Sequence, residues 1–328
     1  MIYRQMPALR DHVFRKSFYA RWGRESAVIS ARARLAEYPE FRQLLSIKAA
    51  FGGSEDYFVD GRRVSVDDDT YLILNHGRSY ASRIEAIRPV YSFSIFFDAD
   101  LTAQVRQALL RRDEQLLTQE ADHSDSAVEF SERLFAHDHV VSPALRHIRT
   151  VVDGGLDDEG WLEEQLLFLL QRMLKNHYNR SSLEARVPSL KPATRRELLE
   201  RIDLGIDYIY TRYAGSIGLR DIAAAARLSP YHFLRTFKAV HRVTPTEFLN
   251  RTRAAKALRL LQTTAWSLTT VAEHVGFGSR SSLFRQMFAV YHKTPQQLRQ
   301  GCTNSRALEE SLLERPVGTH AAVWPGRR

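Results

Sequence analysis

The sequence contains the same helix-turn-helix pattern twice, between residues 219 and 298. In the first copy a short helix carries Ala223 and a second helix follows Ser229; in the second copy Ala272 and Ser279 take these places. Two short helices joined by a tight turn, with alanine where they cross, form the geometry by which a helix enters the DNA major groove. The duplication therefore predicts one chain that reads two successive groove segments.

The spacing of the two copies changes at the turn. Matching residues are 49 positions apart in the first helix of each copy and 50 positions apart after the turn. The second turn therefore holds one residue more than the first, and it lies where Gly276 and Gly278 occur.

Each copy is expected to present one buried and one exposed face of its second helix. Ser229 is a natural N-cap and Pro230 a natural first-turn residue, so this helix is predicted to run to about His241. Its core residues are predicted to be Phe233 and Phe237, which correspond to Leu283 and Met287 in the second copy. The residues left for DNA contact are Tyr231, His232, Arg235 and Lys238 in the first copy and Arg280, Ser281, Phe284 and Arg285 in the second.

Arg235 and Arg285 occupy the same repeat position and are the strongest candidates for base contacts. Arginine can donate two hydrogen bonds to guanine O6 and N7, and an aromatic ring can contact a thymine methyl group. A phosphate contact or a surface ion pair is an open alternative for both arginines.

A long helix is predicted between the copies, from Pro245 to near Thr264. A continuous helix here would fix the distance and angle between the two reading helices. Several basic residues lie on or near it and either contact phosphate or form solvated surface: Arg251, Arg253, Lys256 and Arg259.

Positive charge is concentrated on the duplicated region. Residues 191–300 hold 18 Lys and Arg against 7 Asp and Glu, whereas the rest of the chain holds 29 against 31. A basic region beside a nearly neutral one indicates a polyanionic partner for the first and a different task for the second. With the repeated helix-turn-helix, this pattern predicts binding of double-stranded DNA.

Residues 27–97 are predicted to be mainly β. Asp60-Gly61 is a strong signal for a tight hairpin, because both residues tolerate the positive φ of primed turns. Many short strands at nearly regular spacing indicate a small barrel or sandwich. The β-prone runs are residues 44–51, 57–59, 64–66, 70–74 and 90–97.

Helical periodicity begins near residue 99. Helices are predicted over residues 101–119 and 126–136, and another begins at Pro143 and closes at Gly154-Gly155. A wide apolar stripe follows with 4-3-4 spacing, which fits either a helix seam between two chains or a helix that covers the barrel. The stripe consists of Leu162, Leu166, Leu169 and Met173.

Residues from about 195 to 300 resemble the DNA-binding domain of the AraC/XylS family of bacterial transcription regulators. The resemblance rests on RAAKALRLL at residues 253–261, on Val271-Ala272 with Gly276-Phe277, and on the repeated Thr-Pro at 244–245 and 294–295. It implies binding of promoter DNA through both copies, contact with RNA polymerase and activation of transcription. The N-terminal region resembles, more loosely, the cupin-like sensing and dimerisation domain of many family members.

This resemblance gives an α+β protein with a cupin-like β-barrel, helices after it, and an all-α domain with two helix-turn-helix copies. The length of 328 residues suits several domains rather than one core. We expect a sensing domain at residues 1–100, a helical dimerisation and linker region at 101–190, the DNA-binding domain at 191–301 and a tail without assigned function at 302–328. Within the second region, residues 179–192 are the predicted interdomain linker.

The chain departs from the family pattern in the second half of each copy. Arg242 and His292 stand where family members usually carry glycine, at a position that often needs positive φ. Met287 stands where phenylalanine is usual and Phe288 follows it, so either of the two could be the buried residue.

No pattern for catalysis or a cofactor is found. His76 has no second histidine nearby, and neither a Gly-rich phosphate loop nor a serine nucleophile elbow occurs. Cys302 is the single cysteine, which excludes an internal disulfide, a cysteine metal cluster and the cysteine-based methyl transfer of some relatives. No apolar run is long enough for a membrane span. These features predict a non-enzymatic protein without a cofactor, in the bacterial cytoplasm and at the nucleoid when bound to DNA.

The predicted barrel offers lining residues for a small organic effector. An apolar pocket with a few phenols and an arginine, Arg78 or Arg83, would suit such a ligand, although the aromatics also fit ordinary core and strand surface. The aromatic candidates are Tyr57, Phe58, Tyr71, Tyr80, Tyr91, Phe93 and Phe96. The preferred hypothesis is a dimeric regulator controlled by an effector or partner. The alternatives are a constitutive regulator with a purely dimerising N-terminal domain, and a cupin-type enzyme with a DNA-binding module.

Overall fold

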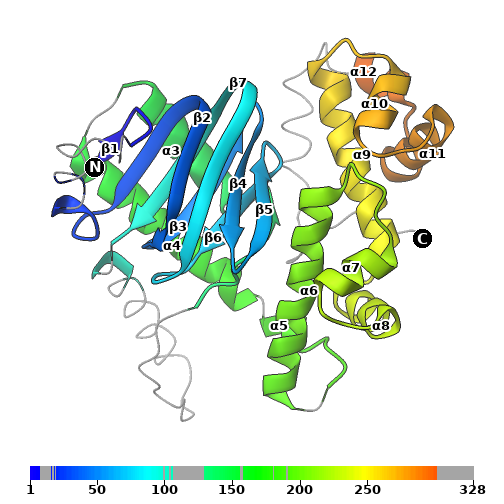
Figure 1. Cartoon of the computed structure of the whole chain (residues 1–328), viewed down its shortest axis with the longest axis horizontal. Coiled ribbons are helices and arrows are strands. Elements are labelled where there is room, and N and C mark those ends of the chain that lie inside the picture. Colours follow the sequence, from blue (N-terminus) through cyan, green and yellow to red (C-terminus); the bar gives the residue numbers. More distant parts are fainter. Residues whose placement is uncertain are drawn as a thin grey trace. The chain divides into compact units, whose positions relative to one another are not determined.

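The computed structural model describes residues 1–7, 16, 18, 20–98, 100–102, 105, 129–155, 158–179, 181–189 and 191–300. The chain divides into two compact units, Met1–Tyr178 and Asn179–Arg328 (Figure 1). Most of the predicted helix over residues 101–119 and the tail from residue 302 lie outside the described residues, as does Cys302.

The first unit is built on a mainly antiparallel sheet. Its order is β1-β2-β7-β3-β6-β8, and a hairpin of β4 and β5 joins it through β7. The strands are β1 (Ile2–Tyr3), β2 (Ala27–Arg42), β3 (Leu45–Phe51), β4 (Ser54–Val59), β5 (Arg62–Asp67), β6 (Thr70–Leu74), β7 (Ser79–Phe97) and β8 (Leu134–Ala136). Residues 134–136, predicted to end a helix, are therefore a strand, and Leu134 is buried against β6.

The sheet forks at β7 instead of closing into a barrel. One edge of β7 pairs with β2 along most of its length. The other edge pairs with β3 over residues 91–97 and with β4 over residues 81–83. In the described part of the chain, β7 therefore has three partner strands. Among the described residues, the main strand order begins at β1 and ends at β8 without closing. The α+β class is as predicted, but the barrel is an open sheet.

The predicted hairpin turn is confirmed. Asp60 and Gly61 both have positive φ, 49° and 72°, as a type I′ turn requires. The turn joins β4 to β5 with Val59 paired to Arg62.

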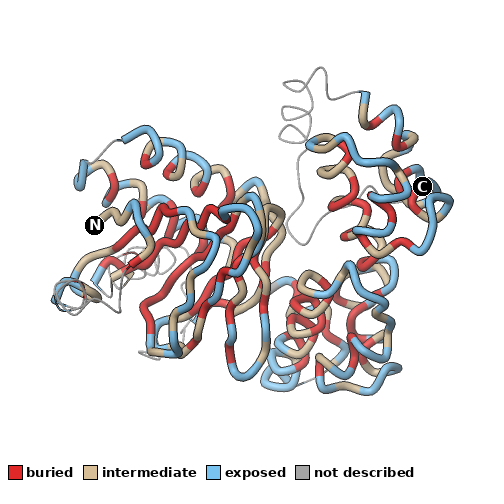
Figure 2. The backbone as a smooth tube through the Cα atoms, turned by 45° about the horizontal axis from the view of Figure 1, so that its top comes forward, coloured by how far each residue is buried: buried red, intermediate tan, exposed pale blue. Residues whose placement is uncertain are grey.

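Among the described residues, the helices α3 (Ser142–Asp153) and α4 (Glu159–Asn179) follow the strands of the first unit. Pro143 lies in the first turn of α3 as predicted, and the chain turns after Asp153 at Gly154 and Gly155, where Gly155 has φ 91°. The helices share one core with strand residues such as Ile47 and Ile95, and their buried sides are red in Figure 2.

The apolar stripe of α4 belongs to this core. Leu162, Leu166, Leu169 and Met173 are each at most 3% exposed and pack with residues of the sheet. The alternative prediction, that these residues form a helix seam between two chains, is therefore wrong, because the core of a single chain already buries them. The stripe covers the sheet, which has the same helical period.

The described part of the second unit is built from helices. They are α5 (Ser181–Glu184), α6 (Pro192–Arg212), α7 (Leu219–Ala225), α8 (Pro230–His241), α9 (Pro245–Thr263), α10 (Leu268–His274), α11 (Arg280–Tyr291) and α12 (Pro295–Gln300). One core surrounds Phe233 and Phe237 and another surrounds Leu283 and Met287. Helix α9 supplies residues to both cores, which makes it the rigid connection between the two helix-turn-helix copies.

The predicted linker over residues 179–192 is largely folded. It contains α5, and Leu183 and Val187 are buried in a cluster with Leu198, Leu199 and Val240. These apolar side chains hold the segment on the second unit, so it is not an extended linker.

Candidate nucleic-acid interface

The turns of the two helix-turn-helix copies have the same backbone geometry, except that the second turn contains one extra residue. Arg227 and Gly276, which are 49 positions apart, both adopt left-handed backbone with φ 55° and 82°. The next residue in each copy donates its N–H to the carbonyl of the crossing alanine: Leu228 to Ala223 at 3.0 Å, and Phe277 to Ala272 at 2.8 Å. The copies therefore match through Phe277, and the extra residue is Gly278.

Both reading helices, α8 and α11, begin in the same way. The Ser229 hydroxyl accepts a hydrogen bond from the His232 amide at 3.3 Å, and the Ser279 hydroxyl accepts one from Ser282 at 3.1 Å. This confirms the predicted N-caps and the predicted span from Pro230 to His241.

The helices also end alike. Arg242 and His292 cap them in left-handed backbone, with φ 62° and 55°. The amide of Arg242 donates to the carbonyl of Lys238, and that of His292 to the carbonyl of Phe288, both at 2.9 Å. The bulky residues thus take the positive φ for which the family uses glycine.

The buried faces are as predicted, and the open question in the second copy is answered. Phe233 and Phe237 are completely buried, and so are Leu283 and Met287. Phe288 is 52% exposed, so Met287 is the core residue of α11.

The predicted contact residues lie together on the opposite face of each helix. Tyr231 is 74% exposed and His232 is half-buried, while the remaining candidates are all exposed. Arg235 and Arg285 form no hydrogen bond or ion pair with any described residue, so the alternative of a surface ion pair has no support within the described chain. Both guanidinium groups are available to an external acceptor.

Two of the basic residues on α9 have internal roles. Arg253 donates from Nε to the carbonyl of Tyr213 at 2.7 Å and from Nη2 to that of Gly215 at 2.8 Å. Burial lowers the pKa of Arg253. Lys256 is 2% exposed, with Nζ 5.0 Å from the centre of the Tyr213 ring. Lys256 is therefore buried and is not solvated surface, while Arg253 is half-buried and directs two of its donors to backbone carbonyls.

Comparison with known proteins agrees with this geometry. A family model described as a helix-turn-helix domain matches residues 222–301. The regulatory protein PocR of Salmonella typhimurium is 35% identical over 94 residues, which cover 28% of this chain and 31% of PocR. The second unit therefore contains a helix-turn-helix domain similar to those of known transcription regulators. The HTH-type transcriptional activator RhaS of Escherichia coli O157:H7 is 31% identical over 119 residues, or 34% of this chain and 42% of RhaS.

The chain thus spans less than half the length of these curated relatives. Among solved structures, the DNA-binding domain of AdpA in complex with a target DNA is similar to part of this chain, with a TM-score of 0.31 and 24% identity over 32% of this chain and 96% of that one. ToxT from Vibrio cholerae O395 has a TM-score of 0.34 and 11% identity over 85% of this chain and 99% of its own. Within the described residues, no helix has the length and apolar character needed to cross a bilayer.

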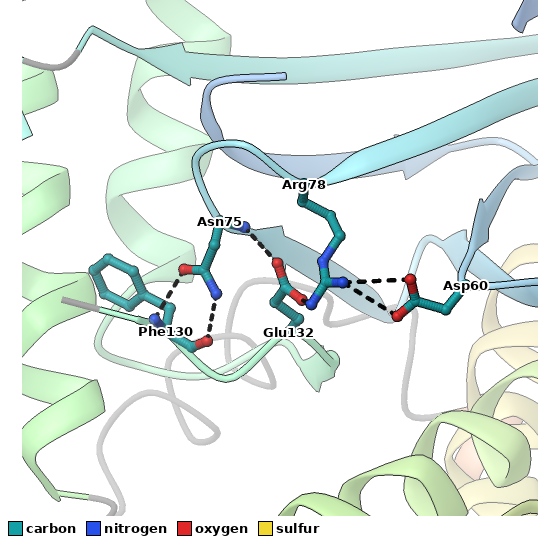
Figure 3. A network of polar contacts seen from close by, with 5 residues as sticks. All are labelled: Asp60, Asn75, Arg78, Phe130 and Glu132. Carbon is teal, nitrogen blue, oxygen red and sulfur yellow. Dashed lines mark hydrogen bonds and ion pairs between the residues drawn. The ribbon is translucent and has the colours of Figure 1, made fainter. Parts of the chain in front are cut away.

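The first unit does not use its predicted arginines in an apolar pocket. Arg78 forms ion pairs with Glu132 and Asp60 near the end of β6 (Figure 3). Asn75 ties the same network to Phe130 through two hydrogen bonds, at 2.8 and 2.9 Å. Arg83 pairs with Glu85 on the surface, so neither arginine is free to line a pocket as expected.

A different set of residues lines a cavity of about 50 Å³ in this unit. Of the predicted aromatics, Tyr57, Tyr80 and Phe96 border it, whereas Phe58 is 38% exposed. The other three predicted aromatics, Tyr71, Tyr91 and Phe93, belong to the core shared with α3 and α4. The charged residues of the cavity are Lys48 and Glu55, which the sequence reasoning missed. Their signal was weak: one lysine inside an apolar strand and one glutamate in a hairpin strand.

The described residues contain no group of three or more His, Cys, Asp or Glu side chains placed to hold a metal ion. His76 lies at the turn after β6, as its sequence context indicated.

Proposed function

We propose that this chain is a transcription activator that reads promoter DNA with α8 and α11 and responds to an effector or partner at its N-terminal unit. One observation carries the DNA-reading part. Arg235 and Arg285 occupy the same place on two helices that begin with the same serine cap and end with the same left-handed cap, and both are exposed and unpaired among the described residues.

The chemistry of these helices suits a duplex. Each arginine can donate two hydrogen bonds to one guanine edge in the major groove. Tyr231, His232 and Lys238 lie beside Arg235, and Arg280, Ser281 and Phe284 lie beside Arg285, as further base or phosphate contacts. The net positive charge of residues 191–300 supplies attraction that does not depend on sequence.

Regulation is assigned to the first unit. Effector or partner binding there would change promoter occupancy or contact with RNA polymerase, and a homodimer would double the number of reading helices at the bacterial nucleoid. Support for an activator comes from the relative named a transcriptional activator. The cavity in the first unit favours effector control over a constitutive regulator whose N-terminal unit only dimerises.

A salt-dependent titration tests the DNA-reading part. The full chain is titrated with its own upstream promoter region and with a scrambled duplex. Arg235→Ala and Arg285→Ala are measured in parallel, and Arg196→Ala, which removes an exposed arginine of α6, is the matched control.

We expect the wild type to prefer the promoter by about a thousandfold or more. Each reading-helix variant should lower that preference by roughly 5- to 150-fold, corresponding to about 1–3 kcal/mol for a bidentate base contact. The Arg196→Ala variant should keep it. Equal binding of promoter and scrambled DNA, with a salt slope only, would contradict sequence-specific reading.

A further inference from the structure

The cavity in the first unit is lined by buried polar side chains and by aromatic rings. Glu55 is 3% and Lys48 2% exposed, although both are ionisable. Burying such groups costs free energy unless partners are supplied. Their presence around an open space therefore points to a ligand that supplies those partners.

Lys48 is surrounded by rings. Its Nζ lies 3.4 Å from the centre of the Phe96 ring, 5.2 Å from that of Tyr80 and 6.0 Å from that of Tyr57. Among the described residues, no carboxylate oxygen lies within 4.0 Å of Nζ. The ring faces stabilise the ammonium form, but they accept no conventional hydrogen bond, so its N–H groups can still donate to a ligand oxygen.

Glu55 has the complementary property. Its Oε2 atom is buried without a hydrogen-bond partner. Burial raises the pKa of this carboxyl group, while hydrogen bonds from Ser92, Tyr57 and Ser82 and the charge of Lys48 act in the opposite direction. The free oxygen can accept a hydrogen bond from a ligand.

Gln43 adds a second free acceptor. Its side chain lines the cavity, is 6% exposed and leaves Oε1 without a partner. Two unpartnered acceptors therefore lie on the wall of the same small space as the Lys48 donor. A ligand that satisfies all three needs both donor and acceptor capacity.

The lining also contains apolar side chains. Phe18 stacks on Trp22 with ring centres 4.5 Å apart, and Trp22 meets Phe96 edge-on at 4.6 Å. Ile29 and Phe41 also line the cavity. This wall suits a short hydrocarbon part of the ligand.

The charge of the cavity selects against ions. Burial acts against the charged form of both groups, since it lowers the pKa of Lys48 and raises the pKa of Glu55, and a bound anion or cation would add a further charge to this buried site. A hydroxyl group avoids this, because its oxygen accepts from Lys48 while its proton is donated to Glu55 or Gln43. The volume of about 50 Å³ leaves room for roughly three to five water-sized groups.

We infer that this cavity binds a small uncharged molecule that carries one or more hydroxyl groups beside a short apolar part. This inference rests on the proposed effector control and names the class of effector. The bound molecule would hydrogen-bond to Lys48 on β3 and Glu55 on β4, pack against the aromatic rings and so stabilise the first unit.

Four probes of similar size separate the alternatives: ethane-1,2-diol, propan-1-ol, acetate and propylammonium. Each is titrated against the full chain without DNA, and binding is followed by the melting temperature and by tryptophan fluorescence, since Trp22 borders the cavity. We expect saturable binding of the diol or the alcohol, and weaker or no binding of the two ions. Trp22→Phe should remove the fluorescence change and keep the rise in melting temperature.

Two variants connect binding to the polar wall. Lys48→Met and Glu55→Gln should each weaken binding of the hydroxyl probe by about tenfold or more, because a buried hydrogen bond to a charged group is lost. Lys175→Met, at an exposed lysine of α4, is the matched control and should bind like the wild type. If Lys48→Met does not fold, Gln43→Met removes one free acceptor and takes its place.

The inference is overturned if neither hydroxyl probe binds saturably, if an ion binds at least as tightly, or if the polar-wall variants bind like the wild type. Because these measurements contain no DNA, their failure leaves promoter reading untouched. Conversely, a failed promoter titration with successful probe binding would overturn the DNA-reading proposal and keep the binding site.

Discussion

The two helix-turn-helix copies share a backbone but differ in the side chains placed on it. Both use a serine cap, a left-handed residue in the turn and a left-handed residue at the end of the reading helix. Lys238 of the first copy corresponds to Phe288 of the second, so an exposed ammonium stands where the other copy exposes a phenyl ring. The reading helix contributes Phe233 and Phe237 to the first core, and Leu283 and Met287 to the second.

This difference shows which positions the repeated fold constrains. Caps and left-handed positions recur because the backbone needs them in both copies. The exposed positions have diverged, as expected if the two helices meet different parts of a DNA site. The turn is the exception, because there the copies differ in both length and residue type.

The largest expected effect lies in the second turn. A Cβ on Gly276 would come within 2.7 Å of the Ala214 carbonyl oxygen, and φ is 82° there. Gly276→Ala should therefore lower the free energy of unfolding by about 2–4 kcal/mol, from backbone strain and a steric clash. Urea unfolding of the full chain measures it.

Gly278, the extra residue, provides the control for this prediction. A Cβ there would meet nothing within 4 Å, so Gly278→Ala should change stability by no more than about 0.5 kcal/mol. Equal effects of the two substitutions would contradict a constraint specific to Gly276.

The next prediction compares two arginines that donate hydrogen bonds to backbone carbonyls just before the first helix of each copy. Arg253 makes two bonds, to the carbonyls of Tyr213 and Gly215, while Arg299 bonds to the carbonyl of Trp266. Arg253→Met should cost about 1.5–3 kcal/mol of stability, and Arg299→Met about 1 kcal/mol. Because the Arg253 bonds are internal, its loss should leave the salt slope of DNA binding unchanged; a lower slope would indicate a phosphate contact instead.

A smaller effect is expected from exchanging the exposed residues that differ. If Lys238 contacts phosphate, Lys238→Phe makes the negative slope of log K against log salt less steep by about 0.9. Phe288→Lys makes it steeper by a similar amount. The measurement is a promoter titration at several salt concentrations, with Arg196→Ala as the reference. Unchanged slopes in both variants would mean that neither position faces the DNA backbone.

The smallest effect concerns the helix ends. Arg242→Gly and His292→Gly should each raise the free energy of unfolding by about 0.5–1 kcal/mol, because glycine adopts positive φ without strain. Chemical denaturation of the two single variants and the double variant measures this. A gain in one copy and a loss in the other would show that one of these side chains makes a stabilising contact that glycine lacks.

The second unit was largely predictable because its signals are local. Ser229 followed by Pro230 marks a helix start whatever the tertiary context, and duplication allows each copy to check the other. The choice between Met287 and Phe288 was not local. Both lie near the helical apolar stripe, and only packing against α9, α10 and α12 decides which is buried.

The first unit was less predictable because long-range pairing shapes it. The run at residues 90–97 is only half of β7; the other half alternates exposed charges such as Arg83 and Glu85 with buried residues. The fork at β7 depends on partners far apart in sequence. Lys48 could not be placed inside from its residue type, since lysine is rarely buried.

The buried, unpartnered oxygens Gln43 Oε1 and Glu55 Oε2 also bear on the amount of protein in a cell. A unit that buries such groups without partners is less stable than one in which a ligand supplies them, and ligand binding adds stability by mass action. A change of 1–2 kcal/mol in stability is enough to alter abundance several-fold, because unfolded chains are degraded. Accumulation of the regulator would then report the effector alongside promoter occupancy, and the time needed to degrade existing chains would set how quickly the response decays after the effector is gone.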